Sequence, residues 1–93
     1  MKIDEQQSVQ GFVELVHRFL SRELSPTDFE QEFFRRWGQD RTTRSPEVFA
    51  VLERFFFVVE DYVDDPELRD PGDLDEEQLR AGAQRFLDEV AAL

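Results

Sequence analysis

Apolar side chains recur every three or four residues along four separate stretches of this chain. The first stretch contains Val9, Phe12, Val13, Val16, Phe19 and Leu20. This spacing places the side chains on one face of an α-helix, whereas a half-buried strand alternates at every second residue. One short run, residues 55–59, resembles a buried strand, but it lies within a longer helical pattern. The sequence therefore predicts an all-α protein.

Helix start and stop signals divide the chain into four helices. Ser-Pro pairs at 25–26 and 45–46 each place a capping serine before a proline, which is favoured at the first helical position. Gly38 predicts the end of the second helix, and Asp73 followed by Glu76 is a capping signature for the fourth. With short connections these signals predict an antiparallel four-helix bundle, in a single domain over residues 1–93, with helices near residues 8–23, 26–37, 46–63 and 74–91.

Bulky side chains give this short chain enough material for a core, since ten of its 93 residues are phenylalanine. The third helix has the broadest apolar face, which predicts a central helix with two neighbours. We expect that face to contain Val48, Phe49, Leu52, Phe55, Phe56, Val59 and Val63, widened by Val51, Val58 and Tyr62. Phe57 points about 150° away from this face, so it is a candidate exposed anchor.

Negative charge dominates the chain and is concentrated in one region. There are 22 Asp and Glu against 11 Lys and Arg, for a net charge of −11, and residues 60–77 contain ten acids and only one base, Arg69. Such a surface repels nucleic acid and anionic membranes and favours a basic protein partner. Acids near residues 73–77 suit a helix N-terminus, but those at 60–65 crowd a helix C-terminus, where negative charge is unfavourable. That placement favours a functional explanation.

The sequence offers little chemistry for a metal, a cofactor or catalysis. It has no Cys and one His, no register of the acidic run fits a calcium loop, and no glycine-rich phosphate loop is present. The carboxylates lie on a solvated segment, whereas general acid catalysis needs a desolvated carboxyl group. The first ten residues lack the apolar run typical of a signal peptide, and no stretch of about 18 apolar residues occurs. We therefore expect a non-enzymatic, cofactor-free cytoplasmic protein.

Eight residues are predicted to contact the partner, through an acidic patch with an apolar anchor: Glu53, Phe57, Glu60, Asp61, Asp64, Asp65, Glu67 and Asp70. A small basic patch, formed by Arg35, Arg36, Arg41 and Arg44, is best explained by complementarity with a helix C-terminus. It is also a candidate to face the acidic region and steady it.

A series of short motifs follows one another along the chain: Phe19-Leu20, Leu24-Ser25, Asp28-Phe29, Arg35-Arg36, a Phe-rich third helix, and then Glu60 and Asp64-Asp65. Their order resembles the colicin D immunity family over roughly residues 9–90. The resemblance implies a four-helix bundle that binds the ribonuclease domain of a bacteriocin or contact-dependent toxin. In the type member the toxin cleaves the anticodon loop of transfer RNA, and acids of the immunity protein lie where substrate phosphates would.

The interpretation is thus an immunity protein, monomeric when free, that forms a 1:1 complex with a basic nuclease toxin. Two alternatives stay open. An acidic nucleic-acid mimic that inhibits a DNA-binding protein would spread its acids along an elongated surface. A small helical scaffolding or dimerisation module would self-associate through an apolar patch, and the broad apolar face of the third helix keeps this alternative open.

Overall fold

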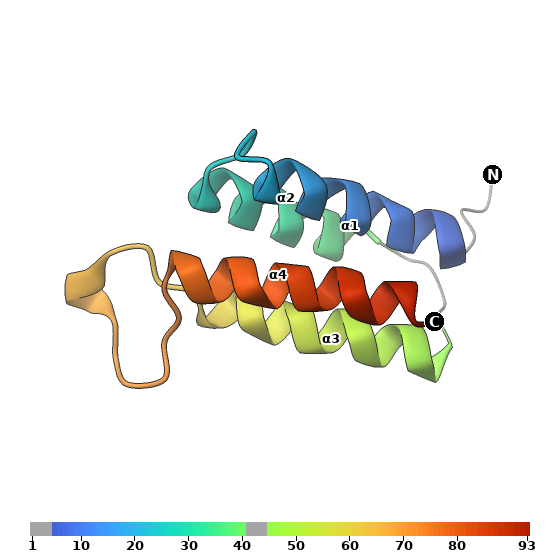
Figure 1. The fold of residues 1–93 in the computed structure, drawn as a ribbon. Helices are drawn as coiled ribbons and strands as arrows, with labels where there is room; N and C mark the ends of the chain where they lie inside the picture. The colour runs from blue at the N-terminus through green and yellow to red at the C-terminus, as the bar shows by residue number, and fades with distance from the viewer. Residues whose placement is uncertain (1–4, 41–44) are drawn as a thin grey trace.

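The computed structural model describes residues 5–40 and 45–93, which form four α-helices and one short 3₁₀ helix. They are α1 (Glu5–Leu20), α2 (Pro26–Gln39), α3 (Pro46–Asp61), η1 (Pro66–Leu68) and α4 (Glu76–Ala91). Successive α-helices run in opposite directions (Figure 1). The described part contains no strand, only one isolated β-bridge. The predicted all-α, antiparallel four-helix bundle is confirmed.

The two Ser-Pro signals begin helices as predicted. Ser25 accepts a hydrogen bond from the backbone N–H of Asp28 at 3.1 Å, and Ser45 accepts one from that of Val48 at 3.4 Å. The predicted stop at Gly38 is wrong, because that glycine is helical and α2 continues to Gln39. The connection predicted between the second and third helices, residues 38–45, is helical at residues 38–39, and residues 41–44 lie outside the described residues.

The first helix starts at Glu5 and ends at Leu20, three residues before the predicted end. Arg22 has a left-handed φ of 69°, which turns the chain sharply. The N–H of Arg22 then bonds to the carbonyl of Phe19, and that of Glu23 bonds to the carbonyl of Arg18, at 3.0 and 2.9 Å. This is the Schellman pattern, usually made with glycine, and it terminates α1 at Leu20, the last apolar residue of the periodic pattern.

The predicted boundaries around the acidic segment are also displaced. Helix α3 ends at Asp61, two residues early, and α4 starts at Glu76, two residues late. The N-cap of α4 is Asp75, which forms a capping box with Gln78. Leu74 pairs with Tyr62 in the isolated β-bridge and is therefore extended. The bridge explains why Asp73, the predicted cap, does not begin the helix.

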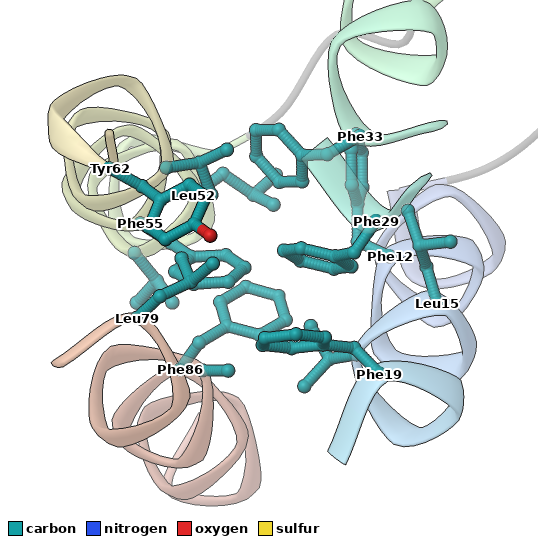
Figure 2. Packing of buried hydrophobic residues seen from close by; sticks show 14 of the residues in the cluster. Phe12, Leu15, Phe19, Phe29, Phe33, Leu52, Phe55, Tyr62, Leu79 and Phe86 are labelled. Atoms are coloured by element: carbon teal, nitrogen blue, oxygen red, sulfur yellow. The ribbon is translucent and has the colours of Figure 1, made fainter. Parts of the chain in front are cut away.

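Aromatic rings fill the centre of the bundle and join α2 to α3 (Figure 2). Phe33 of α2 lies edge-on to Phe55 of α3 with ring centroids 5.3 Å apart, and Trp37 lies 4.6 Å from Phe56. Phe29 and Phe33 are fully buried, together with Phe12 and Phe19 of α1. Helix α1 packs on α2 and α4, and α3 packs on α4, so α1 and α3 are diagonal in the bundle.

Helices α3 and α4 approach closely because Gly82 has no side chain. A Cβ atom at Gly82 would lie 2.6 Å from Cγ1 of Val58, which is too close without a shift. On the core side of α3 the buried residues are Val51, Leu52, Phe55 and Val59, continued by Tyr62. The prediction that Phe49 belongs to this core is wrong, because its side chain is 44% exposed.

The molecule measures 44 × 23 × 22 Å. A helix of 16 residues is about 24 Å long. Part of the extra length comes from the segment between α3 and α4, which projects beyond one end of the bundle (Figure 1). We call this segment, residues 62–75, the α3–α4 loop.

Candidate functional site: an acidic helix end and loop

Backbone hydrogen bonds close the base of the α3–α4 loop. The N–H of Leu74 donates to the carbonyl of Asp61 at 2.8 Å, and the N–H of Val63 donates to the carbonyl of Leu74 at 3.1 Å. These bonds hold the two ends of the loop side by side. The loop therefore leaves the bundle and returns to it at one fixed point.

Side chains within the loop fix its shape. Arg69, the one base of the acidic run, donates through Nε to the carbonyl of Val63 at 2.7 Å and through Nη2 to that of Asp64 at 3.4 Å. The carboxylate of Asp73 accepts from the N–H of Asp70 at 2.8 Å, and that of Asp65 caps η1 through the N–H of Glu67 at 2.9 Å. Arg69 thus donates hydrogen bonds to backbone carbonyls and forms no ion pair with an acid of the described part.

The turn in the loop depends on glycine. Gly72 has a φ of 102°, which side-chain-bearing residues rarely adopt. It follows Pro71, whose ring restricts the preceding residue as well. The pair therefore fixes where the chain turns back toward α4.

Asp64 links the loop to the bundle. Its carboxylate accepts a hydrogen bond from the hydroxyl of Tyr62 at 2.9 Å, and the Tyr62 side chain is buried. Burial, this hydrogen bond and the negative charges of Asp64 and Glu76 raise the pKa of Tyr62 to about 12, while Arg69 lowers it slightly. On α2, burial and the charge of Asp64 raise the pKa of Glu30.

All eight predicted contact residues are exposed, but they lie in two groups. The first group lies on the outer face of α3 and contains Glu53, Phe57, Glu60 and Asp61. The second group lies on the loop and contains Asp64, Asp65, Glu67 and Asp70. Glu60 and Asp61 occupy the last turn of α3, where the loop begins. Glu53 lies about 10 Å further back along the helix than Glu60, so among the four residues on α3 it is the farthest from the loop.

None of the acids in these two groups has a cationic partner among the described residues. Within the described residues, the ion pairs involve Glu23, Glu32, Glu76 and Glu89, none of which belongs to the predicted site. We use the name acidic surface for the six acids at the helix end and in the loop: Glu60, Asp61, Asp64, Asp65, Glu67 and Asp70. Phe57 is 52% exposed beside them, as the sequence predicted.

Two features of the loop were not predicted from the sequence. Leu68 is 70% exposed at the end of η1, and Arg69 stabilises the loop by a hydrogen bond to the carbonyl of Val63. The Asp-Pro pair before η1 was a usable signal for a capped turn, since Asp caps and proline favours a first helical position. No local pattern showed that Arg69 would bond to carbonyls instead of carboxylates.

The two described arginines of the basic patch, Arg35 and Arg36, do not face the acidic surface. Arg35 pairs with Glu32, and Arg36 lies over the ring of Phe12 at 5.9 Å. Both lie near the C-terminal end of α2, at the end of the bundle opposite the loop (Figure 1). Arg41 and Arg44 lie outside the described residues. The suggestion that Arg35 and Arg36 face the acidic region is therefore wrong.

The described residues contain no group of three or more His, Cys, Asp or Glu side chains arranged to hold a metal ion. None of the helices described is long and apolar enough to cross a membrane. The arrangement can present fixed negative charge and an exposed aromatic ring to another molecule.

Comparison with known proteins identifies the family. No curated protein matches the chain closely enough to serve as a relative. A family model, described as bacterial self-protective colicin-like immunity, matches residues 7–90, which includes all four helices almost completely and the acidic surface. Members of this family neutralise a cognate toxin protein. This chain belongs to the bacterial self-protective colicin-like immunity family.

Proposed function

We propose that this immunity protein neutralises a ribonuclease toxin of the tRNA-cleaving type by covering its basic active site with the acidic surface. The observation that carries the proposal is a set of exposed carboxylates that have no cationic partner among the described residues. They lie at the end of α3 and on a loop whose shape is fixed by its own hydrogen bonds. The protein acts in the cytoplasm as a monomer, without a cofactor or catalytic activity of its own, and forms a 1:1 complex.

The mechanism is competitive occlusion. A ribonuclease binds substrate phosphates with Lys and Arg side chains, and carboxylates form charge-assisted hydrogen bonds with the same groups. Because the α3–α4 loop is braced by Arg69 and closed at its base, little conformational entropy remains to be lost on binding. Long-range attraction accelerates encounter, and pairs that become desolvated in the complex slow dissociation.

Charge reversal tests this proposal directly. We expect Glu60→Lys and Asp61→Lys each to weaken binding of the cognate toxin domain by about 100-fold or more, because each places a cation against a basic site. The measurement is inhibition of tRNA cleavage, together with calorimetry, using a panel of purified colicin-type ribonuclease domains. Glu14→Lys is the matched control, since Glu14 is an exposed acid on α1, diagonal to α3.

Three results would count against the proposal. If wild-type protein inhibits a toxin and both reversals inhibit equally well, the acidic surface is not the interface. If the association rate of the inhibited pair does not fall with rising salt, charge does not steer it. If no ribonuclease of the panel is inhibited but a pore-forming or DNA-cleaving toxin is, the toxin class is wrong although the family is right.

The nucleic-acid-mimic alternative is less well supported. A duplex mimic needs acids distributed along its length, whereas here they gather at one end of a molecule 44 Å long. Competition with duplex DNA for a DNA-binding protein would favour this alternative over toxin inhibition.

A further inference from the structure

The outer face of α3 carries two exposed phenylalanines with a carboxylate between them. Phe49, Glu53 and Phe57 follow one another at four-residue intervals, so neighbouring members of the series are about 6 Å apart along the helix. Phe49 is 44% exposed and Phe57 is 52% exposed. We call these three residues the aromatic stripe.

The side chains around the aromatic stripe leave it uncovered and negatively charged. The neighbouring base on α3, Arg54, turns across the seam to α4, where it pairs with Glu89. Glu60 and Asp61 follow the stripe at the end of the helix, and neither has a cationic partner in the described part. Phe57 does contact the ring of Phe56 at 5.7 Å, which holds it against the bundle.

The same protein shows how such groups bind an arginine. The guanidinium of Arg80 lies over the ring of Phe19 at 4.4 Å, and its Nε donates to the carboxylate of Glu76 at 2.9 Å. Its Nη1 also donates to the backbone carbonyl of Phe19 at 2.9 Å, so a ring, a carboxylate and a carbonyl together hold a largely buried arginine between α1 and α4. The aromatic stripe offers the first two of these groups outward, with a ring on either side of the carboxylate.

We propose that the aromatic stripe binds an arginine side chain of the toxin, stacked on Phe49 or Phe57 and paired with Glu53. This proposal rests on the proposed function, because it takes the toxin as the partner, and it extends the interface beyond the acidic surface. Arginine fits better than lysine because a planar guanidinium stacks on a ring while its N–H groups donate to a carboxylate.

Charge complementarity favours an arginine of the toxin over a second copy of the chain as the partner of the aromatic stripe. Two copies that met through the aromatic stripe would bring Glu53, Glu60 and Asp61 of each protomer together, and like charges at an interface cost several kcal/mol. A basic partner instead gains from the same acids. The chain's net charge of −11 favours such a partner in the same way.

The test uses two synthetic peptides of equal charge, acetylated and amidated Gly-Arg-Gly-Arg-Gly-Arg-Gly and its Lys counterpart, at about 0.15 M salt. NMR titration follows the ring resonances of Phe49 and Phe57. We expect the Arg peptide to bind about two- to fivefold more tightly and to shift both rings. Phe57→Ala and Glu53→Gln should each reduce this preference, whereas Glu14→Gln should keep it.

Equal affinity for the two peptides, or ring resonances that do not move, would overturn the inference. So would a wild-type dimer in sedimentation that Phe57→Ala converts to a monomer, because the stripe would then join two copies. None of these results bears on toxin inhibition, which the reversals at Glu60 and Asp61 test separately. Conversely, a preference for arginine with no ribonuclease inhibited would retain the stripe and reject the toxin class.

Discussion

The acids that begin α4 and the acids that end α3 have the same chemistry and opposite roles. Asp75 caps α4, and Glu76 accepts from Arg80 at 2.9 Å, so these carboxylates hold the fold together. Glu60 and Asp61 lie at the negative end of the α3 dipole without a cationic partner among the described residues. Acids placed where they do not stabilise the fold are the ones available for a partner.

Arg80→Ala should give the largest change, because it removes three contacts of one largely buried side chain. The substitution removes the donor to the carbonyl of Phe19, the stacking on that ring and the nearer of the two arginines that pair with Glu76. We expect the free energy of unfolding to fall by about 2 kcal/mol, measured by urea denaturation. Arg80→Lys should retain part of that stability. If Arg80→Ala unfolded at the wild-type urea concentration, Glu76 would be no more structural than Glu60.

Asp75→Ala tests an acid that begins α4, and Asp61→Asn tests an acid that ends α3. Asp75→Ala removes the N-cap of α4 and should cost about 1 kcal/mol. Asp61→Asn removes a charge from an unfavourable helix end and should stabilise the protein by about 0.3 kcal/mol. Thermal unfolding of both variants at low salt checks the signs. Destabilisation by Asp61→Asn would mean that the free acids support the fold after all.

Tyr62→Phe addresses Asp64, an exposed loop acid that also forms a structural hydrogen bond. At neutral pH the loss should be about 0.5 kcal/mol, because the exposed carboxylate of Asp64 is rehydrated. The pKa of Tyr62 is raised from 10.0 to about 12 in the folded chain, so between these values the native state holds more protons than the unfolded state. The free energy of unfolding therefore falls as pH rises through that interval.

Because Tyr62 is the only tyrosine, phenolate absorbance reports its titration directly. The Phe variant should lose less stability between neutral and alkaline pH than wild type. A phenolate that formed at the ordinary pKa of a tyrosine would show that Tyr62 is neither buried nor bonded to Asp64.

The sequence predicted the helix boundaries well where residues close together in the chain decide them. It predicted them poorly where contacts with other segments decide them. Ser25 and Ser45 each lie before a proline, and both begin a helix. At the start of α4 two capping signatures overlap, and the bridge between Tyr62 and Leu74 selects Asp75 over Asp73. The end of α1 depends on the left-handed backbone of Arg22, a conformation that the residue type does not predict.

The candidate site also contains features that the sequence predicted and features that it did not. Acid density and a disfavoured helix end were visible in the sequence, and so was the outward direction of Phe57. The exposure of Phe49 was not, because the apolar residues of α3 extend around more of the helix than its neighbours cover. Leu68 and Arg69 were also missed, since their surroundings come from residues brought together only by the closed loop.

By itself, then, the sequence determined the helical class, the two Ser-Pro helix starts and the location of the excess charge, because periodicity, capping and composition act over a few neighbouring residues. The tertiary structure decided which acids are neutralised and which apolar side chains stay exposed. Those outcomes depend on packing between distant segments, as when Arg80 crosses from α4 to the end of α1 and Arg54 turns from α3 to Glu89.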